Sequence, residues 1–567
     1  YINKILGIVS YNQVRLDLLE KPVSKSKLEK DIKRIMGDSF SSVVMKEDKI
    51  SITQVDDEIN QIHKMAMLFS IVFILLSILS IYTTMSRLIS NQMVQIGTLK
   101  SLGFYDRQIY FHYGAYGFLV AIIGSLVGVI FGYTVVANLV MNIKKATLTL
   151  PIWKKSFGID SMILIVLIVT VCTLAAIITT RKVIKNNPSF TIKGMLDKKS
   201  SDPGIYKKSR LSYDWLWTLR SIRIHPIRTF MSITAIVGSI VLMVAGLGVW
   251  DSLYSSYQDV YNNEFCYKYI GQVYGESYNN LSHKFNSFDV QFAQSETADF
   301  SFHGIEKSGS LLVLDSGDKI RIFDAKSKKK IRIEKDEVAI ASQLAEQLDV
   351  KVGDKIAYKT KSSLNEHRVT VTAIVDAKIP QGIFIYKDKV KNFEPNTIYI
   401  GDSEAYEQAK KEESISNIIS IKKQQDNMKE MMDSVHSIMY ILIVAAFVLS
   451  VVILYNLGIL SCLERYREYA TMKVIGFNHG EIMGMVFKES VLNLLTGFVI
   501  GIPLSKQFLK LYIRVVSMDS MEWTPIITKD HFLIVIFCVI GFSVLVNLVV
   551  SMRIRRIDMV EALKSVE

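Results

Sequence analysis

Seven long apolar stretches limit what this chain can fold into. They cover about residues 66–86, 114–140, 160–180, 229–250, 437–461, 490–505 and 531–550. Most approach or exceed the roughly 20 residues that a helix needs to cross a bilayer. Half of the 567 residues are hydrophobic, which is too apolar for an ordinary soluble enzyme. The sequence therefore predicts a polytopic α-helical membrane protein with seven spans, placed in contact with the lipid bilayer of a bacterial plasma membrane.

A second feature is an internal repeat at a constant offset of 373 residues. Residues 95–104 read QIGTLKSLGF, and residues 468–477 read EYATMKVIGF. The copies share the pairs Thr98/Thr471, Lys100/Lys473, Gly103/Gly476, Phe104/Phe477, Ile109/Ile482, Ser77/Ser450, Tyr82/Tyr455, Gly124/Gly497 and Gly128/Gly501. Matches in one register over roughly fifty residues indicate a duplication. The same match supports the sixth apolar stretch, which is short and contains Pro503.

Each repeated segment has the pattern of a short amphipathic helix that ends at glycine. The apolar positions are Ile96, Leu99 and Leu102 in the first copy and Tyr469, Met472 and Ile475 in the second, spaced to form one stripe. Gly103 and Gly476 fit the left-handed position after a helix, and we expect the next Phe to contact Leu99 or Met472. A single copy would read as an ordinary capped surface helix. The duplication and the flanking spans favour a shared functional role.

This pattern between membrane spans resembles the FtsX-like (MacB-type) permease family, the membrane subunits of ABC transporters. The resemblance covers roughly residues 60–195 and 215–567. It implies that the short cytoplasmic helix after the second span of each repeat rests on a separate ATPase subunit, with two such subunits for each chain. The positions carried over are Gln95, Thr98, Lys100, Gly103, Phe104, Glu468, Thr471, Lys473, Gly476 and Phe477. Gln95 stands where the family usually has Glu, so the first contact is expected to be weaker.

Small residues on two of the spans suggest close helix packing. Gly124 and Gly128 in the first repeat, and Gly497 and Gly501 in the second, form small-x-x-x-small faces. The interiors of the first three spans contain no Asp, Glu, Lys, Arg or His. Since charged residues at membrane depth are expected in an ion-coupled carrier, that class of transporter is disfavoured.

The charge distribution predicts the orientation in the membrane. Residues 181–228 contain twelve Lys and Arg against Asp197, Asp202 and Asp214, so the positive-inside rule places this linker in the cytoplasm. That orientation also puts both repeated helices inside. A nucleic-acid-binding arm is the alternative reading of such a basic run, but the attachment to spans on both sides disfavours it. Four lysines in the predicted outside loop argue the other way, and they are Lys144, Lys145, Lys154 and Lys155.

We expect six regions along the chain. They are a remnant of a first external domain at 1–64, a first permease repeat at 65–195, a cytoplasmic linker with an interfacial elbow helix at 196–228, a span at 229–250, a second external domain at 251–436 and a second repeat at 437–567. A strand is expected at 13–18 and a helix at 26–36. Because the chain starts at Tyr1 without a signal peptide, we expect a fragment of a protein with eight spans.

The region 251–436 is predicted to be a mixed α/β external domain on a helical stalk. Alternating patterns indicate strands at 319–323, 330–333 and 368–375, and residues 337–356 read strand, helix, turn, strand. This part resembles the small β-rich subdomain of MacB-type external domains. Residues 424–439 look helical and continuous with the next span. A clamp moved by the spans and an inert spacer are both open readings of this domain.

The sequence lacks the motifs that several kinds of enzyme and metal site require. The chain has no Gly-x-x-x-x-Gly-Lys-Ser/Thr loop and no His-Glu-x-x-His, its nine histidines are scattered, and its four cysteines suggest no disulfide framework. His63 and His436 occupy matching positions before spans and are read as interfacial residues in preference to a metal pair. We therefore expect no enzyme activity, cofactor, metal or nucleic-acid partner for this chain, with ATP hydrolysis on separate subunits.

The expected function is that of an ABC-transporter permease subunit. It would transmit the ATP-driven motion of its ATPase partners to the external domains, and so extract a lipoprotein, lipid or peptide from the outer leaflet. The alternative is a non-transporting signalling device that controls a cell-wall hydrolase or a sensor kinase. Both functions need the same helices and the same external domain, so the sequence leaves them open.

Overall fold

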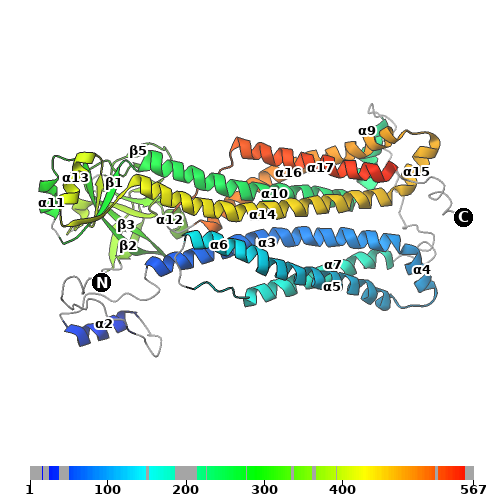
Figure 1. Cartoon of the computed structure of the whole chain (residues 1–567), viewed down its shortest axis with the longest axis horizontal. Coiled ribbons are helices and arrows are strands. Elements are labelled where there is room, and N and C mark those ends of the chain that lie inside the picture. The colour runs from blue at the N-terminus through cyan, green and yellow to red at the C-terminus, as the bar shows by residue number, and fades with distance from the viewer. Residues whose placement is uncertain are drawn as a thin grey trace.

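The computed structural model describes residues 16, 25–37, 50–147, 152–184, 213–224, 226–275, 278–333, 337–360, 366–390, 392–517 and 521–555. In Figure 1 these residues form a long helical bundle with a sheet domain at one end. Two short helices, α4 (Met93–Ser101) and α15 (Tyr466–Ile475), lie at the opposite end. The N-terminal part of the described chain lies near the sheet domain, with α2 (Lys25–Met36) forming the expected helix. The expected strand at 13–18 lies outside the described residues, apart from Leu16.

The described residues contain seven helices that are long and apolar enough to cross a membrane, which confirms the predicted fold class. They are α3 (Ile50–Asn91), α5 (Asp106–Phe131) with its continuation through η3 (Gly132–Val136) and α6 (Ala137–Thr147), α7 (Ile159–Ile184), α10 (Pro226–Asp259), α14 (Ile421–Glu464), α16 (His479–Val516) and α17 (Lys529–Arg555). The helices extend beyond the apolar stretches because their polar ends continue past the bilayer core.

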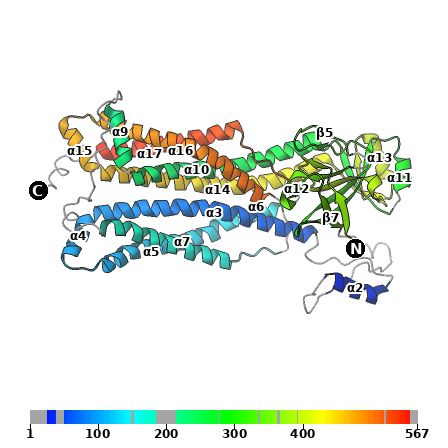
Figure 2. The ribbon, with the colours of Figure 1, turned by 180° about the vertical axis from the view of Figure 1, so that it is seen from behind.

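The duplication is visible as two equivalent sets of helices. The first set is α3, α4, α5 and α7, and the second is α14, α15, α16 and α17. Both views show the sets as two neighbouring layers along the bundle (Figures 1 and 2). Even the helix starts repeat, since the side chains of Gln108 and Glu481 accept hydrogen bonds from the backbone N–H of Tyr105 and Asn478.

Helix α10 forms the centre of the main core. It packs on α14 and α16 and also contacts α3 and α17, and a large group of its side chains is fully buried. Small residues make this possible. A Cβ added at Gly238 would lie 2.6 Å from the Leu76 side chain of α3, and one added at Gly246 would lie 2.3 Å from Ile443 of α14. The helices approach so closely that these positions have no room for a side chain.

The two predicted glycine faces differ in their surroundings. A Cβ on Gly497 would lie 2.5 Å from Ile236 of α10, and one on Gly501 would lie 2.8 Å from Ile240, so this face lies against a helix. For Gly124 and Gly128 the structure corrects the expectation, because a Cβ there would meet no described atom within 4 Å. The reason is that α10 lies beside the second repeat, and no described helix takes the equivalent place beside the first.

The sheet domain between the repeats has mixed topology. Its strands are β1 (Tyr269–Val273), β2 (Val290–Phe302), β3 (Ile305–Leu314), β6 (Val338–Ala341), β7 (Lys355–Thr360), β8 (His367–Thr370), β9 (Ala373–Val375), β10 (Gly382–Tyr386), β11 (Thr397–Ile400) and β12 (Ile415–Ser420). Their order is β12-β1-β11-β2-β3-β10-β6-β9, with β7 on β2 and β8 on β7. The pairs β3–β10 and β6–β9 are parallel, and the others are antiparallel.

Three helices complete this domain, and two short strands form a separate small sheet. The helices are α11 (Tyr278–Lys284), α12 (Ser342–Leu348) and α13 (Ser403–Lys411), with a 3-10 turn η6 (Lys387–Lys389). β4 (Ile322–Phe323) pairs with β5 (Lys330–Ile331). The expected order of strand, helix, turn and strand over 337–356 is confirmed by β6, α12 and β7. Asp349 ends α12 in the left-handed conformation, and Gly353 follows at φ +99°.

Two continuous helices join this domain to the bundle. α14 starts directly after β12 and runs without a break to Glu464, so the expected stalk is the first part of a spanning helix. α10 continues through a π-helical turn, η5 (Val260–Glu264), up to the sheet domain. Where the two parts meet, the Glu264 carboxylate accepts a hydrogen bond from the backbone N–H of Lys378 at 2.9 Å.

One of the lysines that argued against the predicted orientation has a specific role. Lys144 is buried and its Nζ lies 2.9 Å from the Glu58 carboxylate of α3. Its charge is therefore paired inside the fold by the Glu58 carboxylate. The linker itself lies largely outside the described residues, except for the elbow helix α9 (Tyr213–Ile224) and the first turn of α10.

Candidate functional site

The repeat helices α4 and α15 end in the same hydrogen-bonded cap. In α4 the backbone N–H of Phe104 donates to Leu99 O at 3.1 Å, and in α15 that of Phe477 donates to Met472 O at 3.0 Å. Gly103 has φ +91° and Gly476 has φ +106°. Only glycine adopts such angles without strain. The chain thus makes one geometry, the Schellman cap, at both predicted places.

The tips of the repeat helices expose apolar side chains. Leu102 and Ile475, the last residues of the two predicted apolar stripes, are each 71% exposed. They lie at the last turn, where the chain turns away from the bundle, whereas Ile96 and Tyr469 are buried. Other exposed apolar residues beside these tips are Phe104, Tyr105 and Val474. The expected contact positions Gln95, Thr98, Glu468 and Thr471 are also exposed.

The repeated lysines point inward, which the sequence did not indicate. Lys100 Nζ donates to Ile184 O at the end of α7 and lies 3.3 Å from the Asp106 carboxylate. Lys473 Nζ donates to Ile554 O at 3.1 Å, at the end of α17. Cations at helix C-termini satisfy carbonyls that have no partner within the helix and interact favourably with the helix dipole. The resemblance assigned both lysines to the ATPase contact, whereas the structure uses their ammonium groups to fasten the last helix of each repeat.

A buried ion network lies behind α15. Arg465 Nη1 and Arg228 Nη2 each lie 2.8 Å from a carboxylate oxygen of Glu489. Ser221 of α9 donates to the same carboxylate at 3.1 Å. The two arginines and the glutamate are at most 6% exposed. Buried charges of this kind need both their partners and their hydrogen bonds, so the network ties α9, α10 and α16 to the joint between α14 and α15.

The electrostatics keep this network charged. Burial alone would lower the pKa of Arg465, but the Glu489 carboxylate and the Tyr469 side chain together raise it by more, so the guanidinium remains protonated. The Arg465 guanidinium also lies 4.9 Å from the centre of the Trp217 ring of α9, at cation–π distance. Burial raises the pKa of the neighbouring Tyr469 to about 12, so its hydroxyl stays neutral.

Sequence reasoning missed this network. Glu489 directly precedes the sixth apolar stretch, and Arg228 was counted only as one of the basic residues of the linker. The two residues are 261 positions apart, so no local pattern brings them together. A comparison of the two repeats could have pointed to these residues. At the offset of 373, Glu489 corresponds to Tyr116 and Arg465 to Gln92, so the second repeat gains charge at two positions that are neutral in the first.

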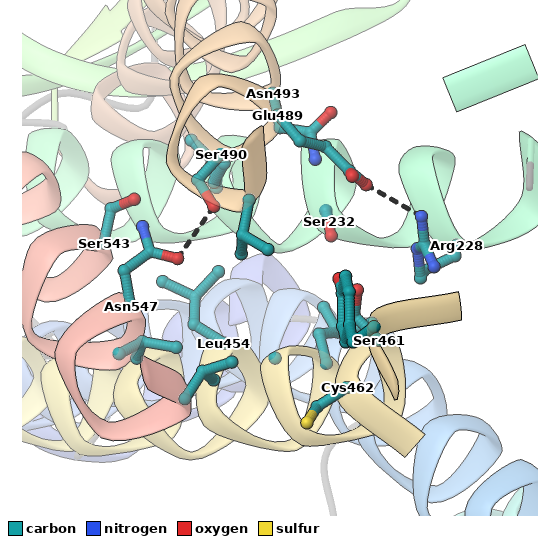
Figure 3. Close-up of a pocket in the computed structure, with 17 residues that line it drawn as sticks. Arg228, Ser232, Leu454, Ser461, Cys462, Glu489, Ser490, Asn493, Ser543 and Asn547 are labelled. Carbon is teal, nitrogen blue, oxygen red and sulfur yellow. Dashed lines mark hydrogen bonds and ion pairs between the residues drawn. The ribbon is translucent and has the colours of Figure 1, made fainter. Parts of the chain in front are cut away.

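A polar cavity of about 70 Å³ adjoins the network (Figure 3). It lies between α10, α14, α16 and α17, and Figure 3 shows Arg228 and Glu489 paired at one side. Ser490 donates to the amide oxygen of Asn547 at 2.8 Å. Asn493 also lines the cavity, and within the described part of the chain its buried amide oxygen has no hydrogen-bond partner. The first repeat has Val120 and Leu174 at the positions of Asn493 and Asn547, so it lacks this polar lining.

The remaining candidate positions show no metal chemistry. Within the described ranges, no three His, Cys, Asp or Glu residues gather in a way that could hold a metal ion. The His436 ring stacks on Trp250 with the ring centres 4.3 Å apart. The strongest candidate binding site is therefore the end of the bundle where the tips of α4 and α15 expose apolar side chains, with the ion network buried behind it.

Comparison with known protein families agrees with this geometry. The family model for the FtsX-like permease C-terminal domain matches the chain twice, at residues 67–188 and at residues 440–559. Each match contains one repeat helix together with the spans around it. A search of curated proteins found no match for this chain. Members of the FtsX-like permease family work with ATPase subunits in ABC systems. The chain is therefore a multi-pass plasma-membrane protein that carries two FtsX-like permease C-terminal repeats, the arrangement of a membrane permease subunit of the ABC type.

Proposed function

We propose that this chain transmits the motion of two separate ATPase subunits from the cytoplasm to the sheet domain outside the membrane. One observation carries the proposal, namely that α4 and α15 form the same capped helix twice, at the same end of the bundle. Each tip exposes large apolar side chains next to polar ones, such as Leu102 and Ile475 beside Gln95 and Glu468. Exposed apolar residues with a polar rim are typical of protein-binding surfaces.

The long helices supply a rigid path for the motion. α14 contains 44 residues, so at about 1.5 Å per residue it is about 66 Å long, roughly twice the hydrocarbon core. It links the joint at Arg465 to the end of β12 without a break. Motion of α15 would therefore reach the sheet domain through α14 directly.

Contacts at the base of the sheet domain support a clamp that moves with the helices. The Glu522 carboxylate, between α16 and α17, accepts a hydrogen bond from Ser342 Oγ at 2.7 Å and lies 3.7 Å from Lys378 Nζ. The backbone N–H of Glu522 donates to Lys378 O at 3.0 Å. Through these contacts, a displacement of α16 and α17 would be transmitted directly to the sheet domain. A lipoprotein, lipid or peptide of the outer leaflet is the cargo that we propose for such a clamp.

Affinity purification tests the function directly. The full chain is tagged, isolated in mild detergent with and without a slowly hydrolysed ATP analogue, and the copurifying proteins are identified. We expect an ABC ATPase at two copies per chain, retained more strongly with nucleotide. Absence of any ATPase from both preparations would contradict the proposal. Recovery of a cell-wall hydrolase or a sensor kinase together with the ATPase would instead indicate the signalling alternative.

A further inference from the structure

The two joints between span and repeat helix have the same backbone but different side chains. Gln92 connects α3 to α4 with φ −103° and ψ 15°. Arg465, its equivalent at the offset of 373, connects α14 to α15 with φ −110° and ψ 14°. The backbone turn is thus shared by both repeats, and the two joints differ in what these side chains contact.

The second joint is fixed by charge. Arg465 reaches Glu489 of α16, which also binds Arg228 at the start of α10. If α15 moved away from α10 or α16, charged groups would lose their partners while still buried, which is strongly unfavourable. α15, α16 and α10 are therefore expected to move as one body. That body includes α10 and is connected through Arg465 to α14, and both of these helices lead into the sheet domain.

Within the described residues, the side chain of Gln92 at the first joint makes a neutral contact. The Gln92 side-chain oxygen accepts a hydrogen bond from the Tyr113 hydroxyl at 2.9 Å. Tyr116 occupies the position equivalent to Glu489 and is 40% exposed. Since no carboxylate stands at this position, the arginine–glutamate network of the second repeat cannot form here. A neutral hydrogen bond can exchange with water, so the turn at Gln92 resists a change of angle less than the turn at Arg465 does. The contacts of Lys100 and Lys473 with the last helix occur in both repeats and do not distinguish them.

We propose that the two ATPase contacts are not equivalent: α15 drives the sheet domain, and Glu489 is the positioning residue that makes α15 rigid with α10, whereas α4 serves as a pivoting anchor. The inference rests on the proposed function, since it concerns how the motion of the ATPases is used. Glu489 is buried, and its role in this proposal is to hold Arg465 and Arg228. Its loss should therefore uncouple motion from hydrolysis and leave assembly intact.

A spin-label distance measurement tests the proposal. The full chain is reconstituted in nanodiscs with the ATPase subunits that copurify with it. One label is placed at Lys145, at the end of α6 in the first repeat, and the other at Lys351 of the sheet domain, both on exposed positions. The distance distribution is recorded with and without the ATP analogue, alongside ATPase affinity and hydrolysis rate. Unmodified protein is expected to show a nucleotide-dependent shift.

Matched variants separate the joints. Glu489→Gln should retain ATPase affinity and hydrolysis but lose the nucleotide-dependent shift in label distance, whereas Tyr116→Phe at the equivalent position should keep all three. Because Glu489→Gln leaves two buried arginines, a neutral triple variant of Arg228, Arg465 and Glu489, each changed to Gln, provides a second test without buried charge. The triple variant should also bind and hydrolyse without the shift.

The outcomes distinguish this inference from the function on which it rests. A normal shift in Glu489→Gln or in the triple variant would overturn the inference, as would loss of the shift in Tyr116→Phe. If the unmodified chain bound no ATPase, or showed no shift with nucleotide, the proposed function itself would fail before the variants were compared.

Discussion

Replacing Gly476 by Val should weaken ATPase binding without disturbing the bundle. Gly476 has φ +106°, and a Cβ there would meet no described atom within 4 Å. The whole cost is therefore conformational. A residue with a side chain costs about 1–2 kcal/mol in a left-handed conformation, and a β-branched one lies at the upper end of that range.

The chain can avoid this strain only by opening the cap. Opening it breaks the hydrogen bonds from Gly476 N–H to Lys473 O and from Phe477 N–H to Met472 O, at 3.1 and 3.0 Å. Each is worth about 0.5–1.5 kcal/mol, so opening costs about as much as the strain. If the ATPase binds only the capped form, equal costs leave roughly half of the chains capped, and strain about 1 kcal/mol above the opening cost leaves roughly a sixth, so the affinity should fall about 2- to 6-fold.

The assay is the binding of fluorescent ATPase to the full chain in nanodiscs. Gly476→Asn is the conservative variant, because asparagine tolerates left-handed angles better than other residues, and it should bind nearly normally. Gly484→Ala is the matched control on α16, where a Cβ would also meet no described atom within 4 Å and φ is not positive. Normal binding by Gly476→Val, or equal weakening in Gly484→Ala, would refute the reasoning.

Three further predictions follow from individual contacts. Lys473→Met removes the hydrogen bond to Ile554 O and should lower the free energy of unfolding, measured by denaturant titration, by about 1 kcal/mol. The ATPase affinity, measured by the same binding assay, should be unchanged. Gly501→Val should destabilise the bundle by about 1–3 kcal/mol because its side chain meets α10, whereas Gly128→Val should not; unfolding in SDS compares the two. Burial raises the pKa of Asp376, but hydrogen bonds from lysines lower it by more, to below its usual value. The carboxylate therefore stabilises the sheet domain above about pH 4, and this contribution is lost as the pH falls through the lowered pKa; thermal unfolding between neutral and acid pH should show a dependence that Asp376→Asn reduces.

The sequence by itself determined the features that depend on local chemistry. Hydropathy and length identified the seven spans because a helix in lipid needs a long apolar surface whatever its neighbours are. The repeat helices and their caps were also predictable. Their apolar spacing is set within three turns, and Gly103 and Gly476 adopt backbone angles that other residues avoid. The order β6, α12 and β7 was also predicted from the local pattern of residues 337–356. The long strands β2 and β3 were not predicted: residues 297–302 of β2 do alternate, but the first half of β2 does not, and β3 ends in a continuous apolar run.

Tertiary structure decided which of two similar sequence features had which role. The glycines of α5 and α16 occupy equivalent positions, yet only Gly497 and Gly501 meet a described neighbour, because α10 lies beside the second repeat. The lysine at position 473 finds its carbonyl partner 81 residues away, and Arg228 finds Glu489 across 261 positions. Such partners come from packing between distant segments, and no periodicity along the chain records them. The buried charge that joins α15 to α10 therefore became visible only when the helices were placed side by side.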